Sequence, residues 1–167
     1  LLLLAAVAIS IASCTKTFDR EADNSIVNAD NAEAVSAENA SAFVEIGSID
    51  LGDAGAAEIS AYDPNTKKLF VAHNAAINKI DVVNLSNPAA PVFITAIDLT
   101  PFGGLVNSLV AKNGFLAAAI EASDKVSDGK VVVFSTDDYT VIKEVTVGAL
   151  PDMVTASDDG KFIMTAN

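Results

Sequence analysis

The sequence repeats a strand–turn–strand pattern at a nearly constant interval. Residues 58–74, 107–121 and 148–167 each contain two short apolar runs separated by a turn rich in Gly, Asp, Asn or Pro. The residues that end the second run, Asn74, Glu121 and Asn167, lie 47 and 46 positions apart. Short strands at a period in the high forties are typical of β-propeller blades. We therefore expect an all-β fold.

Each repeat predicts an antiparallel, four-stranded blade, and about two and a half blades are present. The expected strands are 58–62, 69–74, 79–84 and 92–99 in the first blade, 107–111, 115–120, 130–135 and 140–147 in the second, and 153–156 and 162–165 in the third. A helix over 116–122 is the alternative, since alanine favours helices. The repeat register instead aligns this segment with the β-rich residues 69–72.

One further strand is expected over 43–51, before the first full repeat. Ile49, Ile97 and Val145 begin similar three-residue motifs that lie 48 positions apart, so this segment matches the last strand of the two later blades. In a closed propeller, an N-terminal strand of this kind completes the final blade and leaves no open sheet edge. Because the chain begins without Met and ends within a repeat, we interpret residues 43–167 as the N-terminal part of a propeller domain.

The N-terminal residues predict export and lipid attachment. Residues 1–13 are apolar but shorter than the roughly 20 residues that span a bilayer, as in a secretory signal peptide. Ile11-Ala12-Ser13-Cys14 resembles the lipobox of bacterial lipoproteins, in which Cys14 would carry the acyl chains, such as palmitate, that hold the protein on a membrane. An incidental cysteine in an ordinary signal peptide is the alternative. Thr15 after the cysteine resembles outer-membrane sorting, so we expect a protein anchored in the bacterial outer membrane or at the cell surface.

Residues 14–42 predict a flexible acidic linker that begins at the lipidated cysteine. This segment is rich in Ala, Asn, Ser, Asp and Glu and has few bulky apolar residues, so it cannot bury enough surface to offset the entropy of ordering. A helix over 29–42 is the alternative. A flexible linker would hold the propeller clear of the membrane.

Charge and cysteine content exclude several classes of partner. The formal net charge is −12, and the ten Lys and Arg residues form no basic patch that could bind a nucleic acid. We therefore expect no nucleic-acid partner. Cys14 is the only cysteine, so no disulfide partner exists within the chain and a cysteine-based metal cluster is excluded.

Two sequence resemblances support the propeller. Residues 158–167, Asp-Asp-Gly-Lys-Phe-Ile-Met-Thr-Ala-Asn, resemble the repeat unit of YVTN-type propellers. Residues 55–63, 103–108 and 147–154 resemble the choice-of-anchor I domain, a bacterial surface propeller. This resemblance implies seven blades in an exported protein attached by the anchor of its host, here the lipid on Cys14. Some family members carry an alkaline phosphatase label, but no phosphatase nucleophile motif is present.

Polar residues recur at equivalent positions on one expected face of the propeller. The candidates for a ligand or metal site are Glu58, Asn107 and Asp152 on the first strands, and Asn74, Glu121 and Asn167 at the ends of the second strands. Their oxygen atoms suggest a hard cation such as Ca²⁺, which takes six to eight oxygen ligands. These residue types are also common at strand ends and turns, which is the alternative.

No catalytic residue is predicted. His73 is the only histidine, and no serine or cysteine nucleophile with an adjacent base is identifiable. Residues 123–129 lack the acidic pattern of an EF-hand, so we expect a solvated loop. We expect a surface lipoprotein whose propeller binds an extracellular protein or glycan. The alternative is a metal-dependent phosphoesterase with its site at the channel mouth, and whether the protein is an enzyme stays open.

Overall fold

The described part of the chain is built from β-strands. The structure is a computed structural model that describes residues 44–52 and 57–167. These residues form ten strands and one 3₁₀ helix, η2 (Thr100–Phe102), which carries Pro101 in its first turn. The predicted signal peptide (1–13), Cys14 and the linker (14–42) lie outside the described residues.

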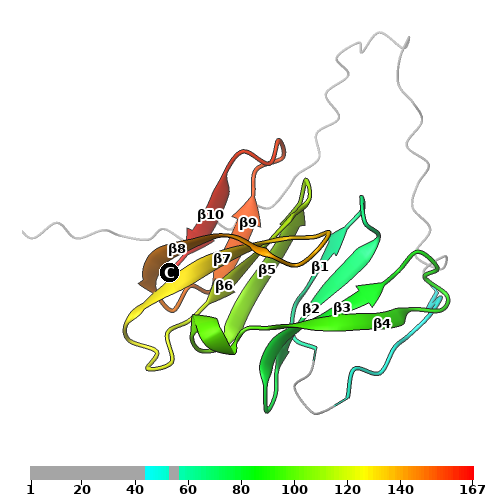
Figure 1. Ribbon diagram of the computed structural model, residues 1–167, viewed down its shortest axis with the longest axis horizontal. Coiled ribbons are helices and arrows are strands. Elements are labelled where there is room, and N and C mark those ends of the chain that lie inside the picture. The colour runs from blue at the N-terminus through cyan, green and yellow to red at the C-terminus, as the bar shows by residue number, and fades with distance from the viewer. Residues whose placement is uncertain (1–43, 53–56) are drawn as a thin grey trace, which may run out of the picture. The chain divides into compact units, whose positions relative to one another are not determined.

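The strands form three antiparallel sheets in chain order (Figure 1). The elements are β1 (Ser60–Asp63), β2 (Lys68–Asn74), β3 (Asn78–Asn84) and β4 (Val92–Asp98) in the first sheet, β5 (Val106–Lys112), β6 (Phe115–Ile120), β7 (Asp128–Ser135) and β8 (Val141–Ala149) in the second, and β9 (Met153–Ala156) and β10 (Ile163–Ala166) in the third. Each of the first two sheets is a four-stranded propeller blade. The predicted β-propeller fold is confirmed, and the alternative helix over 116–122 is wrong because β6 occupies that segment.

The predicted strand over 43–51 is wrong for the residues that the structure describes. Residues 44–51 have no assigned secondary structure and pair with none of the ten strands. A strand requires a hydrogen-bonded neighbour, and the final blade expected to provide one is not among β1–β10. Ile49 and Leu51 instead lie beside Leu69 and Val71 of β2, where all four line a shallow hollow.

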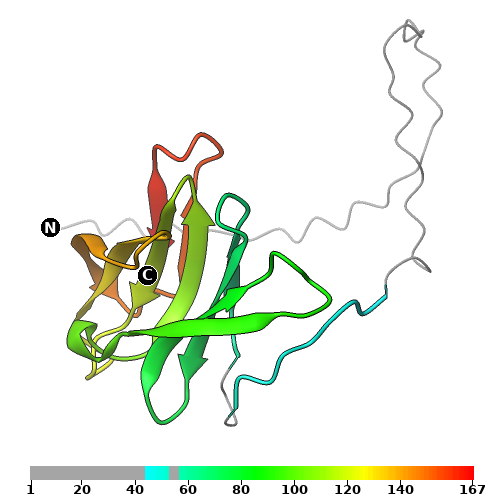
Figure 2. The same cartoon turned by 45° about the vertical axis from the view of Figure 1, so that its right-hand side comes forward.

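The hydrophobic core consists of two layers, each between successive sheets. Figure 2 shows the ribbons of these sheets. The first layer contains Phe70 and Ile80 of the first sheet and Leu116 and Phe134 of the second. The second layer is formed by alternate residues of β6 and β7 with Val154 of β9. Both faces of β6 and β7 are therefore buried, which explains why their sequences are continuous apolar runs rather than alternating ones.

Gly129 of β7 marks a close approach between the second and third sheets. It is buried, and a Cβ at this position would stand 2.5 Å from Pro151 Cδ and 2.7 Å from the carbonyl oxygen of Ile120. Gly129→Ala should therefore lower the free energy of unfolding by about 1–2 kcal/mol through overpacking. Urea unfolding tests this, with Gly148→Ala as control, since a methyl there would meet only the Asn167 side chain at 3.1–3.3 Å. Equal losses in the two variants would contradict the prediction.

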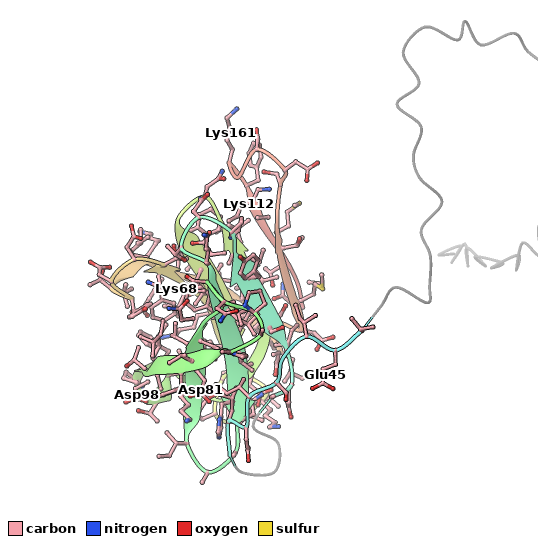
Figure 3. The ribbon with its side chains drawn as sticks, turned by 90° about the vertical axis from the view of Figure 1, so that its right-hand side faces the viewer. Glu45, Lys68, Asp81, Asp98, Lys112 and Lys161 are labelled. Carbon is pink, nitrogen blue, oxygen red and sulfur yellow. The ribbon has the colours of Figure 1, made fainter. Side chains whose placement is uncertain are left out.

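Lys68 joins the first two sheets at the end of the molecule that carries the β1–β2 turn. Its Nζ donates hydrogen bonds to the carbonyl oxygens of Thr136 (2.8 Å) and Asp137 (3.1 Å) in the β7–β8 turn. The ammonium group also lies 4.6 Å from the centre of the Tyr139 ring, at cation–π distance (Figure 3 labels Lys68). The two sheets are thus connected by polar contacts as well as by the apolar core.

Asp63 is a fully buried carboxylate in the same region. Burial alone would raise its pKa, but the nearby Thr136 hydroxyl group, together with hydrogen bonds from the Thr66 hydroxyl (2.9 Å) and the Asn65 N–H (3.1 Å), outweighs this effect and lowers the pKa. A lowered folded-state pKa contributes stability above the unfolded pKa of about 3.9, and this contribution is lost as the pH falls through the folded value.

Asp63→Asn should therefore be less stable than the wild-type protein at pH 7. The difference should shrink below about pH 4, where the wild-type carboxylate becomes protonated. Urea unfolding at pH 7, 4 and 3 measures the effect, with Asp137→Asn in the exposed neighbouring turn as control. If the stability difference between Asp63→Asn and the wild-type protein stayed constant from pH 7 to pH 3, the carboxylate would not be its source.

Candidate functional site

The six predicted site residues lie where the first and second strands of each sheet meet, at the end opposite the β1–β2 turn. The first and second strands run antiparallel, so the start of one lies beside the end of the other. The three members at the start of a first strand are Glu58 just before β1, Asn107 in β5 and Asp152 just before β9. The three members at the end of a second strand are Asn74 in β2, Glu121 just after β6 and Asn167 just after β10.

In the first sheet, Asn74 contacts both its own blade and the next one. Its Nδ2 donates to Glu58 Oε2 at 2.9 Å and to the Val106 carbonyl oxygen at 2.8 Å. Its Oδ1 accepts a hydrogen bond from the Val106 N–H at 3.2 Å. The Asn74 amide therefore pairs with both backbone groups of Val106, as a neighbouring strand would. This side chain joins the first and second sheets.

In the second sheet, Asn107 occupies a comparable place. Its Nδ2 lies 3.2 Å from the carbonyl oxygen of Pro151, just before the third sheet, and 3.4 Å from Glu121 Oε2. The Glu121 side chain is buried, and its Oε1 lies 3.2 Å from the exposed ammonium group of Lys125. Asn107 thus links the second sheet to the third, while Glu121 is held by neighbours on both of its oxygens.

In the third sheet, the two predicted residues are exposed. Asp152 is held through its backbone, because its N–H donates to the Ala166 carbonyl oxygen at 2.9 Å. Asn167 lies against Gly148, where a Cβ would stand 3.1 Å from its own. Neither side chain makes a contact with the other in the described structure comparable to those of the first two blades.

The structure brings these residues together as pairs, one carboxylate with one amide in each of the first two blades. A pair of this kind offers fewer oxygens than the six to eight that Ca²⁺ takes. Among residues 44–52 and 57–167, no group of three or more His, Cys, Asp or Glu is arranged to hold a metal ion. Cation binding at this face stays a prediction. The contacts seen for Asn74 and Asn107 hold blades together.

His73 lies next to Asn74 in β2 but points to the opposite face of the sheet. It is buried, and its Nδ1 lies 2.8 Å from Oδ2 of the buried Asp81 (Figure 3 labels Asp81). Lys79 Nζ lies 2.8 Å from the other carboxylate oxygen, Oδ1. Sequence reasoning identified His73 but missed Asp81. The available signal was a lone carboxylate within the apolar run Ile80–Val83 of β3.

The loop over 123–129 is exposed from Ser123 to Asp128, and the acidic side chain of Asp124 bonds within it. Asp124 Oδ1 accepts hydrogen bonds from the Val126 and Ser127 N–H groups, and Oδ2 accepts one from the Ser127 hydroxyl at 2.6 Å. The Ser127 side-chain bond is the largest cause of the lowered pKa of Asp124. These contacts form an ordinary Asx turn.

Two shallow apolar hollows lie on the sheets. One, of about 240 Å³, is lined by residues 57–60 and by Leu69 and Val71 of β2, with Ile49 and Leu51. The other, of about 110 Å³, lies between β7, β8 and β10. Both are smaller than the roughly 300–1,000 Å³ of a typical small-molecule site.

Sequential four-stranded sheets with a core between successive sheets define a β-propeller. The chain belongs to the choice-of-anchor I domain family, whose model matches residues 58–167. This membership indicates a protein associated with the cell surface.

One solved structure with a similar fold is the hydrazine synthase of Kuenenia stuttgartiensis. The similarity has a TM-score of 0.50 at 18% sequence identity, and it covers 64% of this chain and 28% of that chain. At this identity the similarity supports the fold alone. No curated protein matches the chain at a significant level. Within the part that the structure describes, no helix is long and apolar enough to cross a membrane.

Proposed function

We propose that the protein is a lipid-anchored surface protein whose propeller binds an extracellular protein or glycan. The observation that carries this proposal is the family match over residues 58–167, which indicates surface association. The lipobox-like Ile11-Ala12-Ser13-Cys14 supports attachment through acyl chains on Cys14. Stable anchoring takes more than one acyl chain, as bacterial lipoproteins carry. Thr15 favours sorting to the outer membrane.

The binding face is the end of the blades where Glu58, Asn107 and Asp152 lie. Asn74 and Asn107 connect this face to the backbone of the next blade, so the side chains on it are held at set positions. A preorganised surface loses little entropy on binding. The exposed carboxylates of Glu58 and Asp152 favour a partner with a Lys- or Arg-rich patch, or one that binds together with a cation such as Ca²⁺.

The anchor is tested by replacing Cys14 in the full chain, expressed in a bacterial host. Cys14→Ser should abolish labelling with an alkyne analogue of palmitate and release the protein from the membrane fraction. Ser13→Ala keeps a small residue before the cysteine and should retain both. Continued membrane attachment of the unlabelled Cys14→Ser protein would overturn the lipid anchor.

The binding face is tested by charge reversal. Glu58→Lys with Asp152→Lys should abolish binding to immobilised basic peptides and to glycans on an array, measured with and without Ca²⁺. The matched control is Asp137→Lys with Asp159→Lys, which reverses two exposed charges in turns at the other end of the blades. If both double variants lost binding equally, binding would depend on net charge rather than on this face. Metal-dependent phosphoester hydrolysis that Asp152→Ala abolishes would replace the binding role with an enzymatic one.

A further inference from the structure

Asn113 and Gly114 form the tip of the β5–β6 hairpin and are the only Asn-Gly pair in the sequence. Lys112 pairs with Phe115, so these two residues make a two-residue turn, with φ angles of 48° at Asn113 and 84° at Gly114. Asn-Gly is the preferred pair for such a turn because both residues tolerate positive φ. The same pair is also chemically reactive, because the backbone nitrogen of the glycine can attack the side-chain amide of the asparagine.

The Asn113 side chain is exposed, yet it makes a contact with the next blade. Its Nδ2 donates a hydrogen bond to the carbonyl oxygen of Asp159 in the β9–β10 turn at 3.2 Å. The same nitrogen would stand 2.2 Å from a Cβ on Gly160, so the amide lies directly over that glycine. Lys112 and Lys161 lie at this same end of the molecule (Figure 3). The Asn113 amide thus connects the turns of the second and third blades.

The local structure leaves open the side of the turn where a Gly114 side chain would lie. No atom outside Gly114 and its two chain neighbours is within 4 Å of where its Cβ would stand, although its carbonyl oxygen accepts a hydrogen bond from the Thr136 N–H at 3.0 Å. Without a side chain at Gly114, its backbone nitrogen can approach the Cγ of Asn113. We propose that Asn113 is a site of spontaneous deamidation, and that the modification loosens the contact between the second and third blades.

The reaction needs only water. The deprotonated backbone nitrogen of Gly114 attacks Cγ of Asn113, a new N–C bond forms, and Nδ2 leaves as ammonia, which gives a five-membered cyclic imide. Water then opens either of the two C–N bonds of the imide. One product is an aspartate at position 113, and the other is an isoaspartate in which the main chain runs through the former side chain. No oxidation or reduction occurs.

Both products remove the contact between the blades. The atom that leaves as ammonia, Nδ2, is the donor to the Asp159 carbonyl. A carboxylate oxygen in its place faces the Asp159 carbonyl oxygen, so two acceptors meet and the contact becomes destabilising. The isoaspartate also lengthens the main chain within a two-residue turn, which disturbs the pairing of Lys112 with Phe115.

The modification is tested by incubating the full chain at pH 6 and pH 8.5 and mapping its peptides by mass spectrometry. Aspartate and isoaspartate should accumulate at position 113, and faster at pH 8.5, where more of the attacking amide is deprotonated. Asn65 is the internal control, because it is also exposed in the turn between the first two strands of a blade but precedes Thr66. Modification of Asn113 no faster than that of Asn65 would overturn the proposal.

The structural consequence is tested separately with Asn113→Asp, which reproduces one product. Amide hydrogen exchange in β9 and β10 should be roughly fivefold faster than in the wild-type protein, the change expected from loss of one hydrogen bond. Asn65→Asp should leave exchange in these strands unchanged. Unchanged exchange in Asn113→Asp would show that the amide does not hold the blades together, and would overturn that half of the proposal.

Discussion

Replacing Asp81 with alanine should destabilise the domain by about 3 kcal/mol. The Asp81 side chain is only 1% exposed and contacts two basic groups, His73 Nδ1 and Lys79 Nζ, each at 2.8 Å. Removing it leaves the buried His73 ring without its partner. The effect should fall at the lower end of the range for a broken buried pair, because the Lys79 side chain is 25% exposed and can turn toward water.

Urea unfolding of Asp81→Ala measures this loss, with Asp98→Ala on the neighbouring strand as an exposed control. The double variant His73→Leu with Asp81→Leu removes both partners and fills the site with apolar atoms. It should lose less stability than Asp81→Ala, because no buried polar group is left unpaired. A loss below about 1 kcal/mol for Asp81→Ala would show that this cluster contributes no more than a surface ion pair.

The second large effect is expected for Asn74→Ala, which should lower the free energy of unfolding by about 2–3 kcal/mol. The substitution leaves the N–H and carbonyl groups of the buried Val106 without their partner, and each unpaired group costs about 1–3 kcal/mol. Part of this cost is recovered where water reaches the half-buried site. Glu58 also loses a hydrogen bond, but it is exposed and can bond to water.

Two further asparagines provide a graded control. Asn107→Ala removes a single bond to the neighbouring blade, to the Pro151 carbonyl, so it should cost about half as much. Asn65→Ala alters an exposed turn and should be nearly neutral. Urea unfolding should therefore rank the losses as Asn74, then Asn107, then Asn65. An Asn74→Ala protein as stable as the Asn65→Ala protein would show that the amide does not hold the blades together.

The strands were predictable because their signals are local. Two of the predicted strands, 115–120 and 153–156, match β6 and β9 at both ends. Others differ by one or two residues at their ends; β1, for example, begins at Ser60 rather than Glu58. The strand expected over 43–51 failed for a different reason, since extended backbone becomes a strand only when a partner pairs with it.

The site was predictable only in part. The repeat placed all six residues on one face, and the structure shows that two pairs of them, Glu58 with Asn74 and Asn107 with Glu121, are in contact. The repeat gave no indication that Asn74 bonds to Val106, because that partner has no distinctive side chain. It also gave no indication that Asp81 holds His73, because a lone carboxylate within an apolar run signals burial but does not show which side chain it contacts.

By itself, the sequence determined the all-β architecture, the blade period and the positions of most strands, because periodicity and turn residues act over a few neighbouring positions. Only the tertiary structure decided what the polar residues do. The decisive contacts join residues far apart in the chain, 32 positions from Asn74 to Val106 and 44 from Asn107 to Pro151. Such contacts form only when whole sheets pack against each other, because that packing selects which polar atoms are paired and which stay open to solvent.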